Sequence, residues 1–146
     1  MSNVVAIDVE MVQGAGPGGN VEIPAKVAVV NSSGGVLMET FVQPRFRVTD
    51  YRSEYSGGIT AAQLASGHDL QGDLKAFELT HNNTRDTATY PPFVERYGKG
   101  QKPKLRELAV KELQDRTDRS MSHNHDPVED AQMAMRLFMK YKNEPW

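Results

Sequence analysis

The sequence predicts a single α/β domain, because strand-like apolar segments fill its first third and helical segments dominate the remainder. The chain has 146 residues, enough for one ordinary domain with one hydrophobic core. Its hydrophobic fraction of 38% and its charged fraction of 25% are typical of a soluble globular protein. We therefore expect residues 1–146 to form one domain.

Three strands are expected near the start of the chain, at residues 4–11, 25–32 and 36–44. The short turns between them predict an antiparallel meander. The glycine-rich stretch "QGAGPGGN" between the first two strands is interpreted as a hairpin loop, because it lacks the Lys-Ser/Thr pair of a phosphate-binding loop. Residues 45–59 are expected to form an irregular loop.

The second half of the chain is predicted to be mainly helical. One helix is expected from three apolar residues that share a face, Leu70, Leu74 and Phe77. A short strand is predicted near residues 84–90, and "KPKLRELAVKEL" is predicted to form an amphipathic helix. The last helix should begin at Asp126 as its N-cap, with Pro127 as its first residue.

Composition excludes several classes of protein. The absence of cysteine excludes disulfide frameworks and thiolate metal sites, and it fits an intracellular protein. No apolar run is long enough to span a bilayer, and the first residues lack the pattern of a secretory signal. The net charge of −2 gives no indication of a nucleic-acid partner, so any phosphate-binding surface must be local.

Two carboxylates interrupt the first predicted strand, "VVAIDVEM". Asp8 and Glu10 are two residues apart, so they project from the same side of the strand. Burying an unpaired carboxylate costs several kcal/mol, and the pair becomes tolerable when a cation lies between the two groups. Hard divalent cations such as Mg²⁺ take oxygen ligands of this kind. The alternative is a sheet face that is simply solvated.

Three further residues are candidates for the same site. Asp73 lies on or beside the apolar stripe of its predicted helix, where a carboxylate has no structural reason to be. Asp130 falls in the first turn of the last helix, where compensation of the helix dipole is the alternative explanation. His125 lies five residues before Asp130, and an imidazole placed there could accept a proton from an attacking water.

The segments "AIDVEMV", "GHDLQGDLKAF" and "HDPVEDA" resemble, in order and spacing, the three exonuclease motifs of the DEDDh family of 3′→5′ exonucleases. The context "VTDYRSEYSGGIT", "RDTATYPPF" and "KPKLRELAVKEL" resembles the RNA exonuclease 4-like branch. The resemblance implies a ribonuclease H-like fold, single-stranded RNA or also DNA as substrate, and a nuclear or nucleolar location. It further implies two Mg²⁺ or Mn²⁺ ions, with the acids and the base at Asp8, Glu10, Asp73, Asp130 and His125.

Two other positions match family residues that line the pocket for the terminal nucleotide, Met11 and Arg52. Their alternative interpretations are core packing for Met11 and an ordinary surface charge for Arg52. Both interpretations stay open at the level of sequence.

The chain departs from the family pattern after Leu64. Family members have a helix and an apolar strand before the "GH" motif, whereas "ITAAQLASGHDL" connects the flanking motifs almost directly. About 20 residues, one helix and one central strand, are missing. The vacant strand position would lie beside the first strand, so Asp73 would lose its normal support. A catalytically impaired nucleic-acid-binding relative, or an interaction module with vestigial acids, is therefore the alternative to an active exonuclease.

Overall fold

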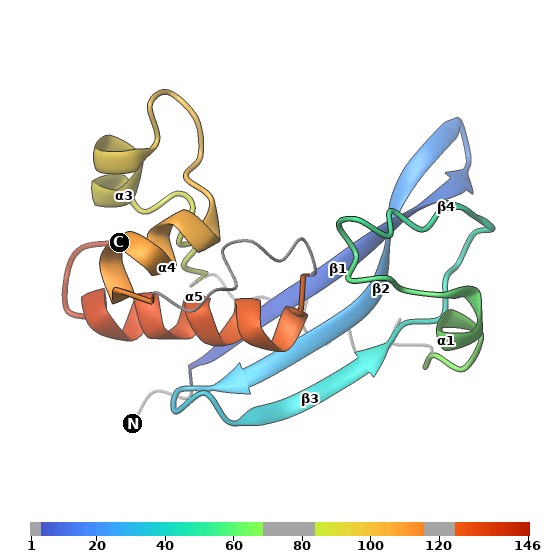
Figure 1. Ribbon diagram of the computed structural model, residues 1–146, viewed down its shortest axis with the longest axis horizontal. Coiled ribbons are helices and arrows are strands. Elements are labelled where there is room, and N and C mark those ends of the chain that lie inside the picture. The colour runs from blue at the N-terminus through green and yellow to red at the C-terminus, as the bar shows by residue number, and fades with distance from the viewer. Residues whose placement is uncertain (1–3, 69–83, 116–124) are drawn as a thin grey trace.

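The computed structural model describes residues 4–68, 84–115 and 125–146 (Figure 1). Asp73, and the helix predicted around Leu70, Leu74 and Phe77, lie outside the described residues. Within them, an antiparallel sheet is crossed on one face by a long C-terminal helix, and shorter helices pack at either end. No helix in these ranges is long and apolar enough to cross a membrane.

The predicted meander is confirmed by three antiparallel strands: β1 (Val5–Gly16), β2 (Gly19–Asn31) and β3 (Val36–Phe41). The first two are longer than the sequence suggested, because most of the glycine-rich stretch belongs to the strands. The turn between β1 and β2 is confined to Pro17 and Gly18, where Gly18 adopts a φ of +92°. A left-handed backbone of this kind is the conformation that glycine supplies most easily.

A fourth strand, β4 (Val48–Asp50), corrects the prediction that residues 45–59 are wholly irregular. It pairs with β1 at Gln13 and Gly14, so the strand order is β3-β2-β1-β4. Three residues are too few to show an alternating pattern, which is why the sequence did not indicate this strand.

The predicted strand near residues 84–90 is wrong. The described part of this segment holds a turn instead, in which the Asp86 side chain accepts a hydrogen bond from the Ala88 N–H at 2.8 Å. The Thr89 N–H also donates to the Asp86 carbonyl at 3.0 Å. The local bonds of an aspartate turn therefore prevail over the strand tendency of the threonines and the tyrosine.

The last helix, α5 (Pro127–Tyr141), begins as predicted, with the Asp126 side chain accepting from the Val128 N–H at 2.9 Å. It packs across β1 and β2, where Ala131 and Met135 are buried against Val30. This packing brings the first turn of α5 over the middle of β1 (Figure 1).

Two other helices of the second half lie within the described residues, α3 (Pro91–Tyr97) and α4 (Leu105–Leu113). The α4 helix was predicted, whereas α3 was not, although two prolines at its first positions are a typical helix-start signal. Both pack on the C-terminal half of α5 around a second core built from Tyr90, Phe93, Leu108 and Leu137. In Figure 1, α3 and α4 lie towards the end of α5 that is opposite its first turn.

At the point of the apparent deletion, the chain forms the short helix α1 (Ala61–Ala65), whose N-cap Thr60 and Gln63 make the expected capping box. It then runs to the outer edge of β3, where the His68 N–H donates to the Phe41 carbonyl at 3.0 Å. The free edge of β1 is on the opposite side of the sheet. Among the residues that the structure describes, pairing on that side of β1 begins only at Gln13.

Candidate metal and catalytic site

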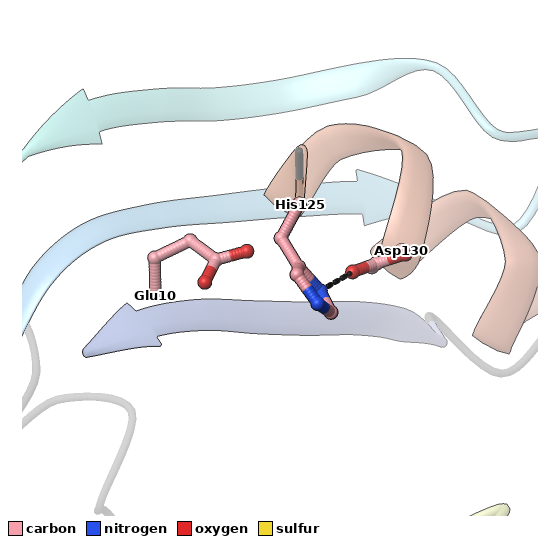
Figure 2. Close-up of side chains that lie close together, drawn as sticks. All are labelled: Glu10, His125 and Asp130. Carbon is pink, nitrogen blue, oxygen red and sulfur yellow. Dashed lines mark hydrogen bonds and ion pairs between the residues drawn. The ribbon is translucent and has the colours of Figure 1, made fainter. Parts of the chain in front are cut away.

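The first turn of α5 and the middle of β1 bring together the acidic site, which we define as Asp8, Glu10 and Asp130. Figure 2 shows the His125 ring between the carboxylates of Glu10 and Asp130. One ligand atom from each of Glu10, His125 and Asp130 lies within 4.8 Å of the ligand atoms of the other two. Of the five motif residues predicted to converge, three meet in this cluster, and the charge of Asp130 also raises the pKa of Asp8. The fifth, Asp73, lies outside the described ranges.

A β-bulge in β2 lies opposite Glu10 and Met11 of β1 at this site. Glu10 lies opposite Lys26 but Met11 lies opposite Pro24, so Ala25 is an extra residue in β2. Bulges re-aim side chains and are common beside active sites, and a proline fits there because it need not donate a ladder hydrogen bond. Lys26, which the sequence did not single out, thus lies across from Glu10 and favours its ionised form.

The three carboxylates repel one another in a partly dehydrated setting. Burial, followed by the charge of Asp130, raises the pKa of Asp8 to about 7. Burial, followed by the charges of Asp8 and Asp130, raises the pKa of Glu10 to about 7, although Lys26 opposes this rise. Within the described ranges, the site therefore holds more negative charge than nearby cations balance.

Asp130 uses its two oxygens differently. Its Oδ2 lies 3.2 Å from His125 Nδ1, whereas its Oδ1 is buried and has no hydrogen-bond partner among the residues that the structure describes. A buried carboxylate oxygen without a partner is costly, because it loses its water and gains nothing in return. Such an oxygen is suited to coordinate a cation.

These donors fit a divalent metal ion. Mg²⁺ and Mn²⁺ favour carboxylate oxygens, and Glu10, Asp8 and Asp130 supply them from two elements. The raised pKa values and the unpaired oxygen of Asp130 both indicate a place where positive charge is needed. A bound cation would remove the repulsion and satisfy that oxygen.

Within the described residues, Met11 and Arg52 form no hydrogen bond or ion pair with the acidic site. Met11 is half-buried on β1, directly after Glu10. Arg52 lies after β4, where its guanidinium is 2.6 Å from Glu22 on β2. It also helps line an open pocket of about 620 Å³, together with Asp50, Ser53, Glu54 and Tyr55.

Several known proteins are similar in sequence to this chain over nearly its whole length. RNA exonuclease 4 of Gibberella zeae is 34% identical, with 95% of this chain and 49% of that protein aligned. RNA exonuclease 4 of Cryptococcus neoformans is 36% identical over 96% of this chain, and that of Homo sapiens is 32% identical over 99%. This chain is a relative of the RNA exonuclease 4 proteins. It spans about half, or less, of their length: 49%, 38% and 38% in these three cases.

The alignments also bear on the apparent deletion. The alignment to the Gibberella zeae protein is 161 residues long, which exceeds the 146 residues of this chain. The relative therefore carries extra residues within the aligned region, as expected if a helix and a strand are missing here. No family model matches the chain.

Solved structures share the fold. The Saccharomyces cerevisiae Pan2 pseudoubiquitin hydrolase–RNA exonuclease module matches with a TM-score of 0.71 and 22% identity, covering 97% of this chain and 28% of that one. The Neurospora crassa Pan2 catalytic unit, with its protease and nuclease domain, matches with a TM-score of 0.67 and 23% identity over 97% of this chain and 27% of that one. The ribonuclease H-like fold implied by the motifs is confirmed.

Proposed function

We propose that this chain is a single metal-dependent 3′→5′ exonuclease domain, residues 1–146, that hydrolyses single-stranded RNA to nucleoside monophosphates. The observation that carries the proposal is the meeting of Glu10, His125 and Asp130 within 4.8 Å. Relatives named RNA exonuclease 4, and the RNA exonuclease module with the same fold, support it. The resemblance also motivates the proposal that DNA is a second substrate and that the chain works in the nucleus or nucleolus.

The acidic residues Asp8, Glu10, Asp73 and Asp130 would hold two Mg²⁺ or Mn²⁺ ions. Two such ions can stabilise both the attacking and the leaving oxygen of an in-line phosphoryl displacement. The contribution of Asp130 rests on its unpaired Oδ1, and those of Asp8 and Glu10 on the need for a counter-charge. The contribution of Asp73 rests on its motif alone.

His125 would act as the general base. Its Nδ1 lies 3.2 Å from Asp130 Oδ2, and a proton held on Nδ1 leaves Nε2 free to accept one from the attacking water. The His125 side chain is 39% exposed, so its ring is accessible to water and to substrate. Asp130 therefore has two tasks, orienting the base with one oxygen and binding metal with the other.

Met11 and Arg52 are proposed to contact the terminal nucleotide. Met11 follows the metal ligand Glu10 directly on β1. Arg52 is engaged by Glu22 at 2.6 Å, so a phosphate or a ribose hydroxyl would have to compete with this ion pair. The ion pair is exposed and therefore weak, so the exchange costs little.

Digestion of one RNA oligonucleotide labelled separately at each end tests this proposal. A 3′→5′ exonuclease releases a labelled mononucleotide at once from the 3′-labelled strand, and it produces a ladder of shortening products from the 5′-labelled strand. Activity should require Mg²⁺ or Mn²⁺. His125→Ala should lower turnover by roughly a hundredfold or more, whereas His68→Ala serves as the matched control, because its side chain is exposed on the far edge of the sheet. Internal cleavage, or full turnover in His125→Ala, would contradict the proposal.

A catalytically impaired RNA-binding relative is the second candidate. The observation that favours it is the route of the chain at His68, which runs along β3 rather than beside β1. Binding of RNA without release of mononucleotides, in the wild-type chain with either metal, would support this second candidate. Insertion of a family-like helix and strand after Leu64 should then restore turnover.

A further inference from the structure

The loop after β4 touches the backbone of His125. Gly57, with a φ of +71°, lies so close that a Cβ atom added there would be 2.3 Å from the His125 carbonyl oxygen. Real Cβ atoms essentially never come this near to a backbone oxygen. From this contact we propose that Gly57 is a positioning residue, which sets the backbone of His125 and through it the imidazole; this inference rests on the function proposed for His125.

The loop that carries Gly57 is held by its own hydrogen bonds. Ser56 is 2% exposed, and its hydroxyl donates to the Tyr51 carbonyl at 2.7 Å. The N–H groups of Tyr55 and Ser56 both donate to the Arg52 carbonyl, at 2.7 and 2.8 Å. The Gly58 N–H donates to the Ser53 carbonyl at 3.2 Å. These hydrogen bonds restrict the conformation of the loop, so the loop can fix the position of a segment that packs against it.

The loop is also anchored to the protein on both sides of Gly57. Ile59 is 4% exposed in the core cluster with Val12 and Leu64, and Tyr51 packs against the same cluster. A side chain at position 57 therefore cannot be accommodated by moving the loop outward without disturbing this core.

On the other side of the contact, the chain after His125 is fixed by the start of α5. Asp126 caps the helix, and Pro127 is buried at its first position. The carbonyl that meets Gly57 belongs to the peptide unit that joins His125 to this cap. Displacing it would tilt that peptide and change the placement of the ring against Asp130, which is now 3.2 Å away.

Gly58 provides a matched control. Its φ of +79° resembles that of Gly57, so alanine is similarly strained at both positions. A Cβ atom at Gly58 would meet no atom of the described residues within 4 Å, whereas one at Gly57 would meet His125. The difference between Gly57→Ala and Gly58→Ala therefore isolates the contact with His125 from the strain in the loop.

The test combines kinetics with a measurement that needs neither metal nor activity. Gly57→Ala should lower kcat by roughly tenfold to a hundredfold with little change in KM, because misplacement of about 1 Å can cost that much. Gly58→Ala should stay near wild type in kcat. In the His125→Ala background, Gly57→Ala should cause no further loss, because the residue through which it acts is gone.

In metal-free protein, the NMR signals of the His125 ring, assigned by their loss in His125→Ala, should shift in Gly57→Ala and stay in place in Gly58→Ala. The NMR measurement is informative even when the wild-type chain proves inactive, so failure of the proposed function is distinguishable from failure of the positioning role.

Equal effects of the two alanine variants, or a kcat loss that persists in the His125→Ala background, would overturn the proposal. If Gly57→Ala does not fold, Ser56→Ala loosens the same loop, and it must lower kcat through His125 in the same cycle or the proposal fails.

Discussion

In the part of the chain that the structure describes, carboxylates are buried in two regions whose surroundings differ. Between α3, α4 and α5, Glu112 is 8% exposed and forms what we call the Glu112 cluster. Its carboxylate accepts from the Tyr97 hydroxyl at 2.7 Å and from the Tyr141 hydroxyl, and it lies 3.4 Å from Arg96 and 3.3 Å from Lys140. Burial acts to raise the pKa of Glu112, but the hydrogen bonds from Tyr141, Tyr97 and Lys140 outweigh it, so the pKa is lowered.

The acidic site has the reverse balance. Burial and mutual repulsion raise the pKa of Asp8 and of Glu10 to about 7, and no described residue pairs with the buried Asp130 Oδ1. A buried charge is tolerable only when it is paired and hydrogen-bonded. The Glu112 cluster meets this condition with partners from the chain, whereas the described residues do not fully balance the charge of the acidic site. The comparison therefore separates an acid that the chain itself neutralises from the acids that we propose bind metal.

The largest expected contrast is in turnover. Asp130→Asn removes one charge and alters the partner of His125, so it should lower kcat/KM by roughly a thousandfold, which corresponds to several kcal/mol of lost metal-assisted stabilisation. Glu112→Gln should leave turnover within a few-fold of wild type at temperatures where it is folded. Single-turnover digestion of 3′-labelled RNA measures both. A similar loss in both variants would mean that the two regions do not differ in role.

The second contrast is in the response to metal. Mn²⁺ should stabilise the wild-type chain by about 2.7 kcal/mol when its concentration is a hundred times the Kd, because it binds the native state alone. Asp8→Asn should lose most of this gain, and Glu112→Gln should keep it. Thermal unfolding with and without Mn²⁺ gives the comparison. An undiminished rise in Tm for Asp8→Asn would show that the acids do not form a shared site.

The third contrast is in the sign of a stability change. Glu112→Gln weakens charge-assisted hydrogen bonds from two tyrosines and a lysine, so it should destabilise the fold by about 1–2 kcal/mol. Glu10→Gln removes repulsion from Asp8 and Asp130, so the metal-free protein should be unchanged or more stable at pH 8. Urea unfolding in the presence of a chelator tests both signs. A loss of stability in Glu10→Gln as large as that in Glu112→Gln would refute the distinction.

Sequence reasoning found the acidic site because strand and helix periods constrain where its residues point. The two-residue spacing of Asp8 and Glu10 put them on one side of β1, and the cap at Asp126 fixed the register of Asp130. The same reasoning would have found Glu112, which follows Leu108 by four residues and Ala109 by three and so lies on the buried stripe of α4. The same kind of signal, a carboxylate on the apolar stripe of a predicted helix, drew attention to Asp73.

Other features could not be read from spacing. The contact of Gly57 with His125 joins residues 68 positions apart, and it depends on how two loops meet. The three residues of β4 and the turn around Asp86 are too short to show a period, so local bonds decide them. The route of the chain at His68 was also unforeseen, because a shortened connection does not reveal which edge of the sheet it will follow.

The smallest expected contrast is in the dependence of stability on pH. Asp8 and Glu10 have pKa values raised from 3.8 and 4.5 to about 7 in the folded protein, so the metal-free native state binds more protons than the unfolded chain across this range. The stability that these protonated groups contribute is present below about pH 4 and is lost as pH rises through 7. The free energy of unfolding should therefore fall by at most about 1.4 kcal/mol per pH unit for each group, and by less for the half-buried Asp8.

Glu112 has a lowered pKa, so its contribution to stability changes with the opposite sign and only below its ordinary pKa of 4.5. The change in stability between pH 5 and 7 therefore reports on the acidic site. Over that interval, Glu10→Gln should flatten the slope and Glu112→Gln should preserve it. Saturating Mn²⁺ should also flatten it, because the cation favours the ionised carboxylates. Metal-free urea titrations at half-unit steps measure the slope, and a stability that rises from pH 5 to 7 would mean that cations of the chain already balance these acids.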